Sequence, residues 1–399
     1  MRERVAIVGD GREVTYGELA RRARAERLPD GAVAIVAAPT VETIVRLCAA
    51  IARRRGVRLI DPRLPSESVS LDGIAADEIA VATSGTSGRA KGVRLSRGAL
   101  TAASAAWWKR VGVDGDERWL LALPLAHVGG LNVVLRSLAA GRTIVVARDP
   151  STGAIADAVE RERVTLASLV PTQLARLLDG DWRPPKHLRA LVVGGAALSP
   201  SLLERARGRG WPILTTYGLS EACGTVAVDG RPLDGIGVRV VDGEIEIGGA
   251  TLMRGYLTNV RSISADGWLR TGDLGFLDGD GRLRVLGRRD DVIVTGGEKV
   301  NPAEVEEALA DAPSIAEACV FAVADDEWGA LVAAAVVGAA DDDEVARAVN
   351  RLTPWQRPRR IARLAALPRN ALGKVDRAAT AALALPLLHA LRRNPRLPG

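Results

Sequence analysis

Short apolar runs alternate with segments of helical spacing through the first half of the chain. Val33–Ala37 has the length and composition of a strand, and Val41–Ala52 then repeats its apolar residues at the spacing of an amphipathic helix. The same order of strand and helix is predicted for Thr143–Ala147, Ile155–Arg163, Leu166–Val170, Thr172–Leu178, Ala190–Val193, Ser199–Gly208 and Ile213–Tyr217. Because apolar strands between helices are typical of a sheet covered on both faces, the pattern predicts layered α/β structure with parallel strands.

Residues that favour helix starts support two further helices. Thr15 is followed three residues later by Glu18, which is a capping pattern. Ser96 stands where a helix from Arg97 would begin, and Glu78–Val81 precedes it as a short strand. The alternation of strand and helix is therefore expected from the N-terminal end onward.

The pattern changes after residue 237. Short apolar runs punctuated by glycine, at Val238–Val241, Glu244–Ile247 and Leu283–Leu286, predict a β-rich region. A compact α+β segment follows, and its first helix is predicted over Val300–Ala310, with Asn301-Pro302 at its start. We therefore predict a large N-terminal domain over residues 1–286, built of layered α/β subdomains and the β-rich region, and a small C-terminal domain over residues 287–399.

The C-terminal segment carries its own pattern of elements. Cys319–Val323 and Leu331–Val337 predict paired strands, and Glu344–Leu352 predicts a second helix. The Ala- and Leu-rich stretch Ala378–Leu391, although interrupted at Pro386 and His389, predicts a terminal helix packed on the protein. The C-terminal domain is therefore expected to be α+β.

Composition narrows the class of protein. The 399 residues are enough for a large core, and the net charge of +6 is spread along the chain, so a nucleic-acid partner is not favoured. Cys48, Cys223 and Cys319 form no Cys-x-x-Cys pair, which points away from zinc and from a disulfide framework. The chain begins without a signal-peptide apolar region, and Ala330–Ala340 is too short to span a bilayer. These features predict a cytoplasmic protein with no membrane span.

The stretch from Ala82 to Gly92 has the composition of an anion-binding loop. It holds three glycines, two threonines, two serines and one lysine. Glycine permits close backbone approach and positive φ, so N–H groups and hydroxyls can turn toward an anion, to which Lys91 adds positive charge. No Gly-Lys-Ser/Thr follows at the spacing of a Walker A motif. By itself the stretch is equally compatible with a polar surface turn.

This loop resembles the phosphate-binding signature of the adenylate-forming enzymes, a family that includes acyl-CoA synthetases, luciferases and adenylation domains. Further segments resemble motifs of that family in the expected order, namely Tyr217-Gly218-Leu219-Ser220-Glu221, Arg270-Thr271-Gly272-Asp273-Leu274-Gly275, Gly287-Arg288-Arg289-Asp290-Asp291, the segment from Gly296 to Glu306, and the segment from Pro368 to Asp376. Only 81 residues precede Ala82, fewer than in most of the family, so a shortened first subdomain is expected.

The resemblance implies an enzyme that activates a carboxylic acid with ATP. The carboxylate attacks the α-phosphate and releases pyrophosphate, and a thiol then displaces AMP. Both steps join or separate anions, so charge neutralisation and positioning should dominate the catalysis. The small molecules implied are ATP, Mg²⁺, CoA and a carboxylic acid, and the resemblance leaves open whether the chain forms a homodimer.

The family's roles transfer to the residues at matching positions. The resemblance implies that the phosphates are bound by Thr83, Ser84, Gly85, Thr86, Ser87, Gly88 and Lys91, and the α-phosphate by Ser220. It implies that Glu221 binds Mg²⁺, that Asp273 binds the ribose, that Arg288 reaches the ribose or phosphate side, and that Lys374 contacts the reacting groups. It also implies that the adenine is bound by Tyr217 and Gly218 with Gly195, Ala196 and Ala197. Without it, Glu221 fits a surface glutamate, Tyr217 a core aromatic, Asp273 a turn and Lys374 a solvated side chain.

The second step implies a different arrangement of the same chain. By resemblance, the C-terminal domain is a mobile lid that rotates about Asp290 once pyrophosphate has left, and Lys374 moves away. Gly296, Gly297 and Lys299 then approach. The glycines would let the pantetheine arm of CoA pass close to the backbone, and Lys299 would meet a phosphate of AMP or CoA.

Leu121–Leu131 is predicted to line the acyl pocket, where His127 either contacts the acid as a catalytic or gating residue or has a structural role. Leu123–Leu131 of this segment, with Val170–Leu174, Leu214–Cys223 and Val294–Glu298, resembles the 2-succinylbenzoate–CoA ligases of menaquinone biosynthesis. The acid implied is 2-succinylbenzoate, whose second carboxylate needs a further cation that the sequence does not identify.

Three alternatives stay open. The chain fits a CoA ligase for another aryl or short- to medium-chain acid, and it also fits an adenylation enzyme that loads a carrier protein. A third alternative is a nucleotide-binding protein without turnover, which the presence of Lys374, Glu221 and Asp273 disfavours.

Overall fold

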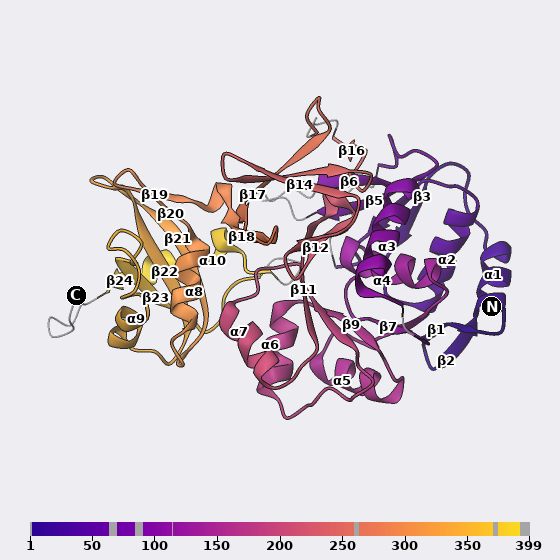
Figure 1. The fold of residues 1–399 in the computed structure, drawn as a ribbon, viewed down its shortest axis with the longest axis horizontal. Helices are drawn as coiled ribbons and strands as arrows, with labels where there is room; N and C mark the ends of the chain where they lie inside the picture. The colour runs from indigo at the N-terminus through magenta and orange to yellow at the C-terminus, as the bar shows by residue number, and fades with distance from the viewer. Residues whose placement is uncertain are drawn as a thin grey trace.

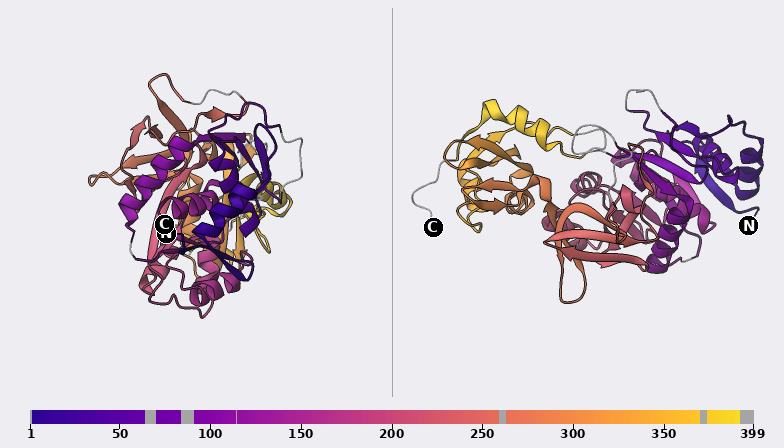
Figure 2. Two further views of the ribbon diagram at one scale, coloured as in Figure 1. Left: turned by 90° about the vertical axis from the view of Figure 1, so that its right-hand side faces the viewer. Right: turned by 90° about the horizontal axis from the view of Figure 1, so that it is seen from above.

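The computed structural model describes residues 2–63, 70–83, 91–113, 115–258, 263–369 and 374–391, with the backbone alone for Thr83 and Lys91. The chain forms a large N-terminal part and a small C-terminal part that lie at opposite ends of the long axis (Figures 1 and 2). This arrangement and its mixed α/β content confirm the predicted fold class. Within these ranges no helix has both the length and the apolar character needed to cross a membrane.

The largest sheet has the strand order β13-β12-β11-β10-β9-β7-β8-β1-β2. Strands β7 to β11 run parallel, whereas the outer pairs β1–β2 and β11–β12 are antiparallel. β9 and β10 are buried along their whole length, as their continuous apolar sequences predict. The bounds are Val5–Gly9 (β1), Arg12–Thr15 (β2), Arg118–Leu121 (β7), Thr143–Val146 (β8), Leu166–Leu169 (β9), Ala190–Val193 (β10), Ile213–Leu219 (β11), Gly224–Val228 (β12) and Arg231–Pro232 (β13).

A second sheet has the order β16-β6-β5-β4-β3, with bounds Val33–Val36 (β3), Val57–Ile60 (β4), Glu78–Thr83 (β5), Lys91–Ser96 (β6) and Gly255–Tyr256 (β16). β3, β4 and β5 are parallel, and β5 pairs with β6 as an antiparallel hairpin. β6 was not predicted, because only alternate residues such as Val93 and Leu95 are apolar and buried, and the glycine-rich loop precedes them.

Helices cover both sheets. Their bounds are Tyr16–Ala25 (α1), Val41–Ala52 (α2), Arg97–Val111 (α3), Val128–Ala139 (α4), Thr152–Arg161 (α5), Pro171–Asp179 (α6) and Pro200–Gly208 (α7). The predicted caps are confirmed, since the hydroxyls of Thr15 and Ser96 accept hydrogen bonds from the N–H groups of Glu18 and Ala99. α4 was not predicted because Gly129-Gly130 lowers helix propensity at its start. A Cβ at Gly130 would lie 2.4 Å from the carbonyl oxygen of Pro124, so this turn requires glycine.

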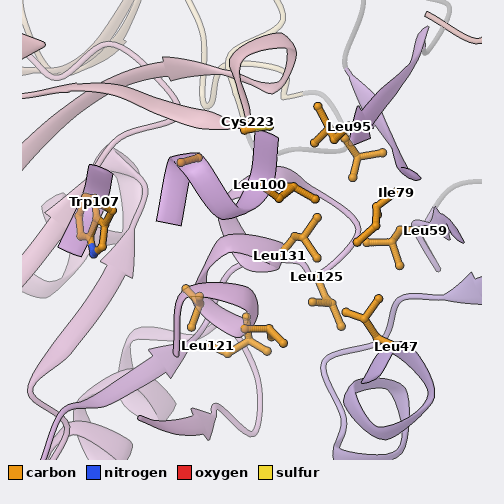
Figure 3. Packing of buried hydrophobic residues seen from close by; sticks show 14 of the residues in the cluster. Leu47, Leu59, Ile79, Leu95, Leu100, Trp107, Leu121, Leu125, Leu131 and Cys223 are labelled. Carbon is orange, nitrogen blue, oxygen red and sulfur yellow. The ribbon is translucent and has the colours of Figure 1, made fainter. Parts of the chain in front are cut away.

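The main core extends from the second sheet to the largest sheet, and part of it lies between the second sheet and the helices beside it. Leu59 of β4 and Ile79 of β5 point toward Leu47 of α2 and toward Leu125 and Leu131 (Figure 3). All five side chains are buried, and each such burial contributes about 1.5–3 kcal/mol to folding. This core therefore holds β4 and β5, whose carboxyl ends lead into the predicted site.

A third sheet has the order β14-β15-β17-β18, with bounds Ile236–Val241 (β14), Glu244–Gly249 (β15), Trp268–Leu277 (β17) and Leu283–Arg288 (β18). The predicted β-rich region is confirmed, and each predicted strand lies inside a longer one. β17 was not predicted because it contains Thr271-Gly272-Asp273, whose composition is typical of a turn. It continues through this tripeptide with Gly272 at a φ of +72°.

The C-terminal part contains a hairpin, a further sheet and helices. The bounds are Ile293–Thr295 (β19), Glu298–Val300 (β20), Pro302–Ala310 (α8), Ile315–Asp325 (β21), Gly329–Gly338 (β22), Asp342–Ala348 (α9), Arg360–Arg363 (β23), Arg377–Ala384 (α10) and His389–Ala390 (β24). β21 and β22 are paired as predicted. β18 ends at Arg288 and so runs through the predicted domain boundary at residues 286 and 287, which stays a prediction.

The prediction of one terminal helix through Leu391 was wrong. α10 ends at Ala384, the 3-10 turn Leu385–Leu387 follows, and β24 pairs antiparallel with β23. Pro386 explains the change, because its ring fixes φ and removes the N–H group that a continuing α-helix needs. The prediction that this stretch packs on the protein is confirmed at Thr380 and Ala384, which are buried.

Candidate functional site

The side chains of Tyr217, Asp273 and Arg288 form one hydrogen-bonded group. Asp273 of β17 and Arg288 of β18 are paired in register, and Tyr217 lies in β11. The Tyr217 hydroxyl donates to Oδ2 of Asp273 at 2.7 Å, and Nη1 of Arg288 donates to Oδ1 at 2.8 Å. Each carboxylate oxygen of Asp273 thus holds one donor and keeps a lone pair for another.

The surroundings fix the protonation and the orientation of this group. Burial, together with the Asp273 carboxylate, raises the pKa of Tyr217 above its usual range, so the phenol stays a donor. Nη1 of Arg288 also donates to the carbonyl oxygen of Thr271 at 2.9 Å. A Cβ at Gly272 would lie 2.9 Å from Nη2 of Arg288, so the glycine makes room for the guanidinium.

Glu221 lies next to this group, in the 3-10 turn Ser220–Ala222 that follows β11. The Tyr256 hydroxyl, from β16 of the second sheet, donates to Oε1 of Glu221 at 2.9 Å. The backbone N–H of Met253 donates to the Glu221 carbonyl oxygen at 2.8 Å. Two segments of the chain therefore hold Glu221, one at its side chain and one at its backbone.

Lys374 reaches this group from the C-terminal part of the chain. Burial lowers the pKa of the Lys374 ammonium, the Asp273 carboxylate opposes the shift, Arg288 adds to it, and Glu221 opposes it. Lys374 is half-buried. The structure thus brings four of the predicted residues, from both ends of the chain, into one charged group.

The imidazole of His127 is held between two segments. Nε2 lies 2.9 Å from Oδ2 of Asp61, which follows β4, and Nδ1 lies 3.3 Å from the carbonyl oxygen of Ala82 in β5. His127 itself immediately precedes α4. Both of these oxygens accept hydrogen bonds, and Nη2 of Arg63, a donor, lies 3.3 Å from Nε2.

Asp61 and Arg63 were missed by the sequence analysis. Asp61 is 2% exposed, and Nε and Nη2 of Arg63 donate to its two oxygens at 2.9 and 2.6 Å. Burial by itself raises the pKa of Asp61, but hydrogen bonds from Arg63 and His127 bring it below its usual range. Burial also lowers the pKa of His127, against the effect of Asp61. The available signal was a carboxylate directly after a buried parallel strand, where α/β sheets place ligand sites.

The glycine-rich loop joins β5 to β6, and the backbones of Thr83 and Lys91 pair at its two ends. Ser84, Gly85, Thr86, Ser87 and Gly88 lie outside the described residues. Ser220 begins the turn that carries Glu221. Gly195, Ala196 and Ala197 are exposed and follow β10, beside the parallel strand β11 that carries Tyr217 and Gly218.

The predicted residues of the second step lie elsewhere. Gly296 and Gly297 form the exposed turn of the β19–β20 hairpin, with φ of +57° and +86°, and Lys299 is exposed on β20. Asp290 lies in the 3-10 turn Arg289–Asp291 that joins β18 to β19. Asp290 therefore connects the third sheet to the C-terminal part.

Arg136 is a buried cation on α4, the helix that His127 precedes. It is 3% exposed, its guanidinium lies 4.5 Å from the ring centre of Trp107, and Nη2 lies 3.3 Å from Oγ1 of Thr225. Among the described residues, no carboxylate lies within 4.0 Å of it. Burial lowers the pKa of Arg136 to about 9. A buried charge without a counter-ion is costly, so its presence calls for a physical reason.

Comparison with known proteins finds similarity along most of the chain. Residues 73–257 match the family model for the AMP-binding enzymes, and residues 304–374 match the model for the C-terminal domain of these enzymes. A 2-succinylbenzoate–CoA ligase of Bacillus pumilus is 34% identical over 323 residues, which are 74% of this chain and 66% of that protein. The chain spans about two thirds of the length of the curated relatives it matches.

Solved structures agree with this similarity. The o-succinylbenzoate CoA synthetase of Bacillus subtilis in complex with its acyl-adenylate intermediate is 28% identical, with a TM-score of 0.84 over 94% of this chain and 95% of that chain. The same enzyme with ATP and a magnesium ion is 27% identical, with a TM-score of 0.83 over 95% and 96% of the two chains.

Proposed function

Because this chain belongs to the AMP-binding, adenylate-forming enzymes, we propose that it is an AMP-forming acid–CoA ligase. A carboxylate oxygen attacks the α-phosphorus of ATP, the bond to the bridging oxygen breaks, and pyrophosphate leaves. The CoA thiol then attacks the acyl carbonyl, loses its proton and displaces AMP. The observation that carries the proposal is the group of Lys374, Asp273, Arg288 and Glu221, contributed by both parts of the chain.

Lys374 is proposed to bridge the acid carboxylate and the α-phosphate as they meet. Two anions repel each other at bonding distance, and an ammonium between them reduces that repulsion. The effect is larger in a water-poor site than in solvent, and Lys374 is half-buried. Its position among two carboxylates and one guanidinium supports this role.

Asp273 is proposed to accept hydrogen bonds from the ribose hydroxyls. Tyr217 and Arg288 already hold it by one bond to each oxygen, which leaves an acceptor site on each. Tyr217 and Gly218, with Gly195, Ala196 and Ala197 after the adjacent strand, are proposed to frame the adenine. The phosphates are proposed to be held by Ser220, Thr83, Lys91 and the loop residues Ser84, Gly85, Thr86, Ser87 and Gly88, and Arg288 is proposed to reach the ribose or phosphate side.

Glu221 is proposed to bind Mg²⁺ together with phosphate oxygens. Mg²⁺ is a hard cation that takes one or two carboxylates plus phosphate and water. The residues fit such an ion, because Glu221 accepts one hydrogen bond at Oε1 from Tyr256 and the carboxylate has further acceptor capacity. When bound, the ion supplies charge neutralisation on the phosphates.

His127 is proposed to line the acyl pocket, positioned by Asp61 and Ala82. The contact to Ala82 ties it to β5, the strand that leads into the glycine-rich loop. We therefore expect a change in this loop on nucleotide binding to alter the position of the His127 ring. This link gives a physical route between the phosphate and acid subsites.

The acid is proposed to be 2-succinylbenzoate, as the names of the relatives suggest. This substrate keeps a second carboxylate that is not activated, and its burial needs a cation. Arg136 supports the proposal, because its buried guanidinium lacks a carboxylate partner among the described residues and lies on the helix after His127. A dicarboxylic substrate would provide the missing counter-ion.

For the thioester step, the C-terminal domain is proposed to turn about Asp290 as a lid. Lys374 leaves the site and the β19–β20 turn with Gly296 and Gly297 replaces it. The exposed position of this turn and of Lys299 is compatible with an approach to CoA. Each conformation would then serve one of the two steps.

The proposal is tested with a panel of carboxylic acids that includes 2-succinylbenzoate, benzoate, short- and medium-chain fatty acids and amino acids. Exchange of labelled pyrophosphate into ATP, with magnesium present, measures the first step. AMP release that depends on CoA measures the second. We expect both activities, with 2-succinylbenzoate preferred.

The possible results separate the alternatives. Preference for another acid would replace the substrate and leave the reaction unchanged. Exchange without CoA-dependent AMP release would favour an enzyme that loads a carrier protein. ATP binding without exchange for any acid would refute the proposal in favour of a nucleotide-binding protein.

A further inference from the structure

Two ion pairs flank Asp290 and attach its neighbours to different parts of the chain. On one side, Nη2 of Arg289 lies 2.7 Å from Oε2 of Glu244 in β15. On the other side, Oδ2 of Asp291 lies 3.4 Å from Nε of Arg377 in α10. The exposed Asp290 side chain makes no hydrogen bond or ion pair with any described residue. Asp290 therefore lies between two residues whose side chains form ion pairs, while its own side chain forms none with a described residue.

Glu244 anchors the first side firmly. Its side chain is 5% exposed, and its two oxygens also accept hydrogen bonds at 2.9 Å from the backbone N–H of Gly272 and from Nε of Arg270. Gly272 immediately precedes Asp273. The carboxylate that holds Arg289 thus also holds the part of β17 that carries the proposed ribose ligand.

Arg377 anchors the second side within the C-terminal part. Its guanidinium is paired with Glu306 of α8, and Nη1 donates to the carbonyl oxygen of Val320 in β21. Arg377 begins α10, three residues after Lys374. Asp291 is therefore tied to the same body that carries Lys374.

We propose that Glu244 and Arg377 are positioning residues that hold the two sides of Asp290, so that reorientation of the C-terminal domain is confined to the backbone dihedrals of this one residue. The inference rests on the proposed two-step function. Catalysis is sensitive to placement, and an error of about 1 Å can cost about 100-fold in rate. A flexible linker of several residues would allow Lys374 many positions relative to Asp273, whereas a hinge at a single residue allows it few positions.

The sharpest variant is Arg289→Gln, which removes the first ion pair while Glu244 keeps Arg270 and Gly272. The chain provides a matched control in Arg239→Gln. Arg239 is also 40% exposed at its side chain and pairs at 2.7 Å with Glu246, a buried glutamate two residues further along the same strand. Asp291→Asn removes the second ion pair, and its control is Asp342→Asn, from an ion pair of the C-terminal domain remote from the hinge.

The full-length protein is labelled with a fluorophore pair through Asp181→Cys and Asp326→Cys, two exposed positions in the N-terminal and C-terminal parts. The native cysteines are buried or half-buried, and their background labelling is measured first. Single-molecule transfer efficiency is recorded without substrate. We expect Arg289→Gln and Asp291→Asn to broaden the distribution and to slow pyrophosphate exchange at least tenfold, and both controls to stay within twofold of the parent protein.

An unchanged distribution for both hinge variants would overturn the inference, as would equal broadening in the controls. Because the fluorescence is read without substrate, this result is independent of the acid panel. Absence of exchange in the unsubstituted protein would refute the proposed function. A broadened distribution in that case would still support the two anchoring ion pairs.

Discussion

The hydroxyl of Tyr217 donates a hydrogen bond of 2.7 Å to Oδ2 of Asp273, although the two residues belong to different sheets. Tyr217 stands in the strand proposed to face the adenine, and Asp273 in the strand proposed to hold the ribose. Since Arg288 binds the other oxygen, Asp273 is oriented from two sides before a nucleotide arrives. The relative position of the two sheets is thus part of the nucleotide site.

Tyr217→Phe tests this relationship. The substitution keeps the ring and removes the donor to Asp273. A hydrogen bond to a charged group contributes about 1.5–3 kcal/mol, so we expect the Kd for ATP to rise about tenfold or more. Isothermal titration calorimetry measures the change. Tyr16→Phe is the control, because the Tyr16 hydroxyl donates to the Arg142 carbonyl oxygen at 2.8 Å, far from the site. An ATP affinity unchanged by Tyr217→Phe would contradict the role.

Lys374→Ala is expected to separate the two steps of the proposed reaction. Removal of the bridging ammonium should slow pyrophosphate exchange by about 100-fold to 1,000-fold, as loss of one transition-state donor typically does. Transfer from preformed acyl-adenylate to CoA should be largely preserved, since Lys374 is proposed to leave the site before this step. Lys186→Ala, at an exposed lysine, is the control. Equal loss of both steps would argue against two conformations.

The first step should also depend on the protonation of Lys374. Burial lowers the pKa of this ammonium below its ordinary value of 10.5. The charged form is the active one, so the rate is complete below this pKa and is lost as the pH rises through it. We expect pyrophosphate exchange to fall on the alkaline side with a midpoint below 10.5. Lys374→Arg should move the fall to higher pH, because a guanidinium stays charged. An alkaline limb that does not move would assign it to another group.

The sequence predicted elements best where one periodicity was strong. The α2 helix has the bounds that its apolar spacing predicted, Val41–Ala52, and β10 agrees at both ends as well. β6 and β17 were missed because glycine and polar residues interrupt their alternation, and β-ladder hydrogen bonds to neighbouring strands stabilise them instead. The hydrophobic pattern of one segment carries no information about the strands with which that segment pairs.

The residues of the candidate site were predicted from the resemblance to the family, and the hydrophobic periodicity did not predict them. Motifs identified Asp273, Arg288 and Lys374 one by one, while their proximity arises from the contact between two parts of the chain. Asp61 was not found, because a lone carboxylate after a strand carries little information until His127, 66 positions away, is seen beside it. Arg136 was also not found, because the sequence contains many arginines and does not show which of them is buried.

Asp61→Asn should change the protonation of His127. In the folded protein the Asp61 carboxylate opposes the lowering of the His127 pKa by burial, so its removal should lower that pKa further. Arg63 also faces the ring, with Nη2 3.3 Å from Nε2, and its charge acts in the same direction as burial. The imidazolium should therefore be lost at lower pH in the variant than in the parent.

Nitrogen NMR shifts of the imidazole measure this pKa directly, and the chain has only three histidines. His127→Gln assigns the signal, and the His187 and His389 signals serve as internal controls. A positioning role further requires that the KM for the acid rise more than the KM for ATP. An unaltered His127 titration in Asp61→Asn would disprove the coupling.

Arg136→Met tests the origin of the second carboxylate site. Methionine fills a similar volume without a charge, and it removes the cost of burying a charge that has no carboxylate partner among the described residues, so the melting temperature should not fall. If Arg136 meets the second carboxylate of 2-succinylbenzoate, the KM for this acid should rise about tenfold or more, the value of a charge-assisted bond. The analogue that lacks the ring carboxylate, 4-oxo-4-phenylbutanoate, should lose no affinity. An equal rise for both acids would mean that Arg136 shapes the pocket without binding the carboxylate, and no rise for either would remove it from the acid site.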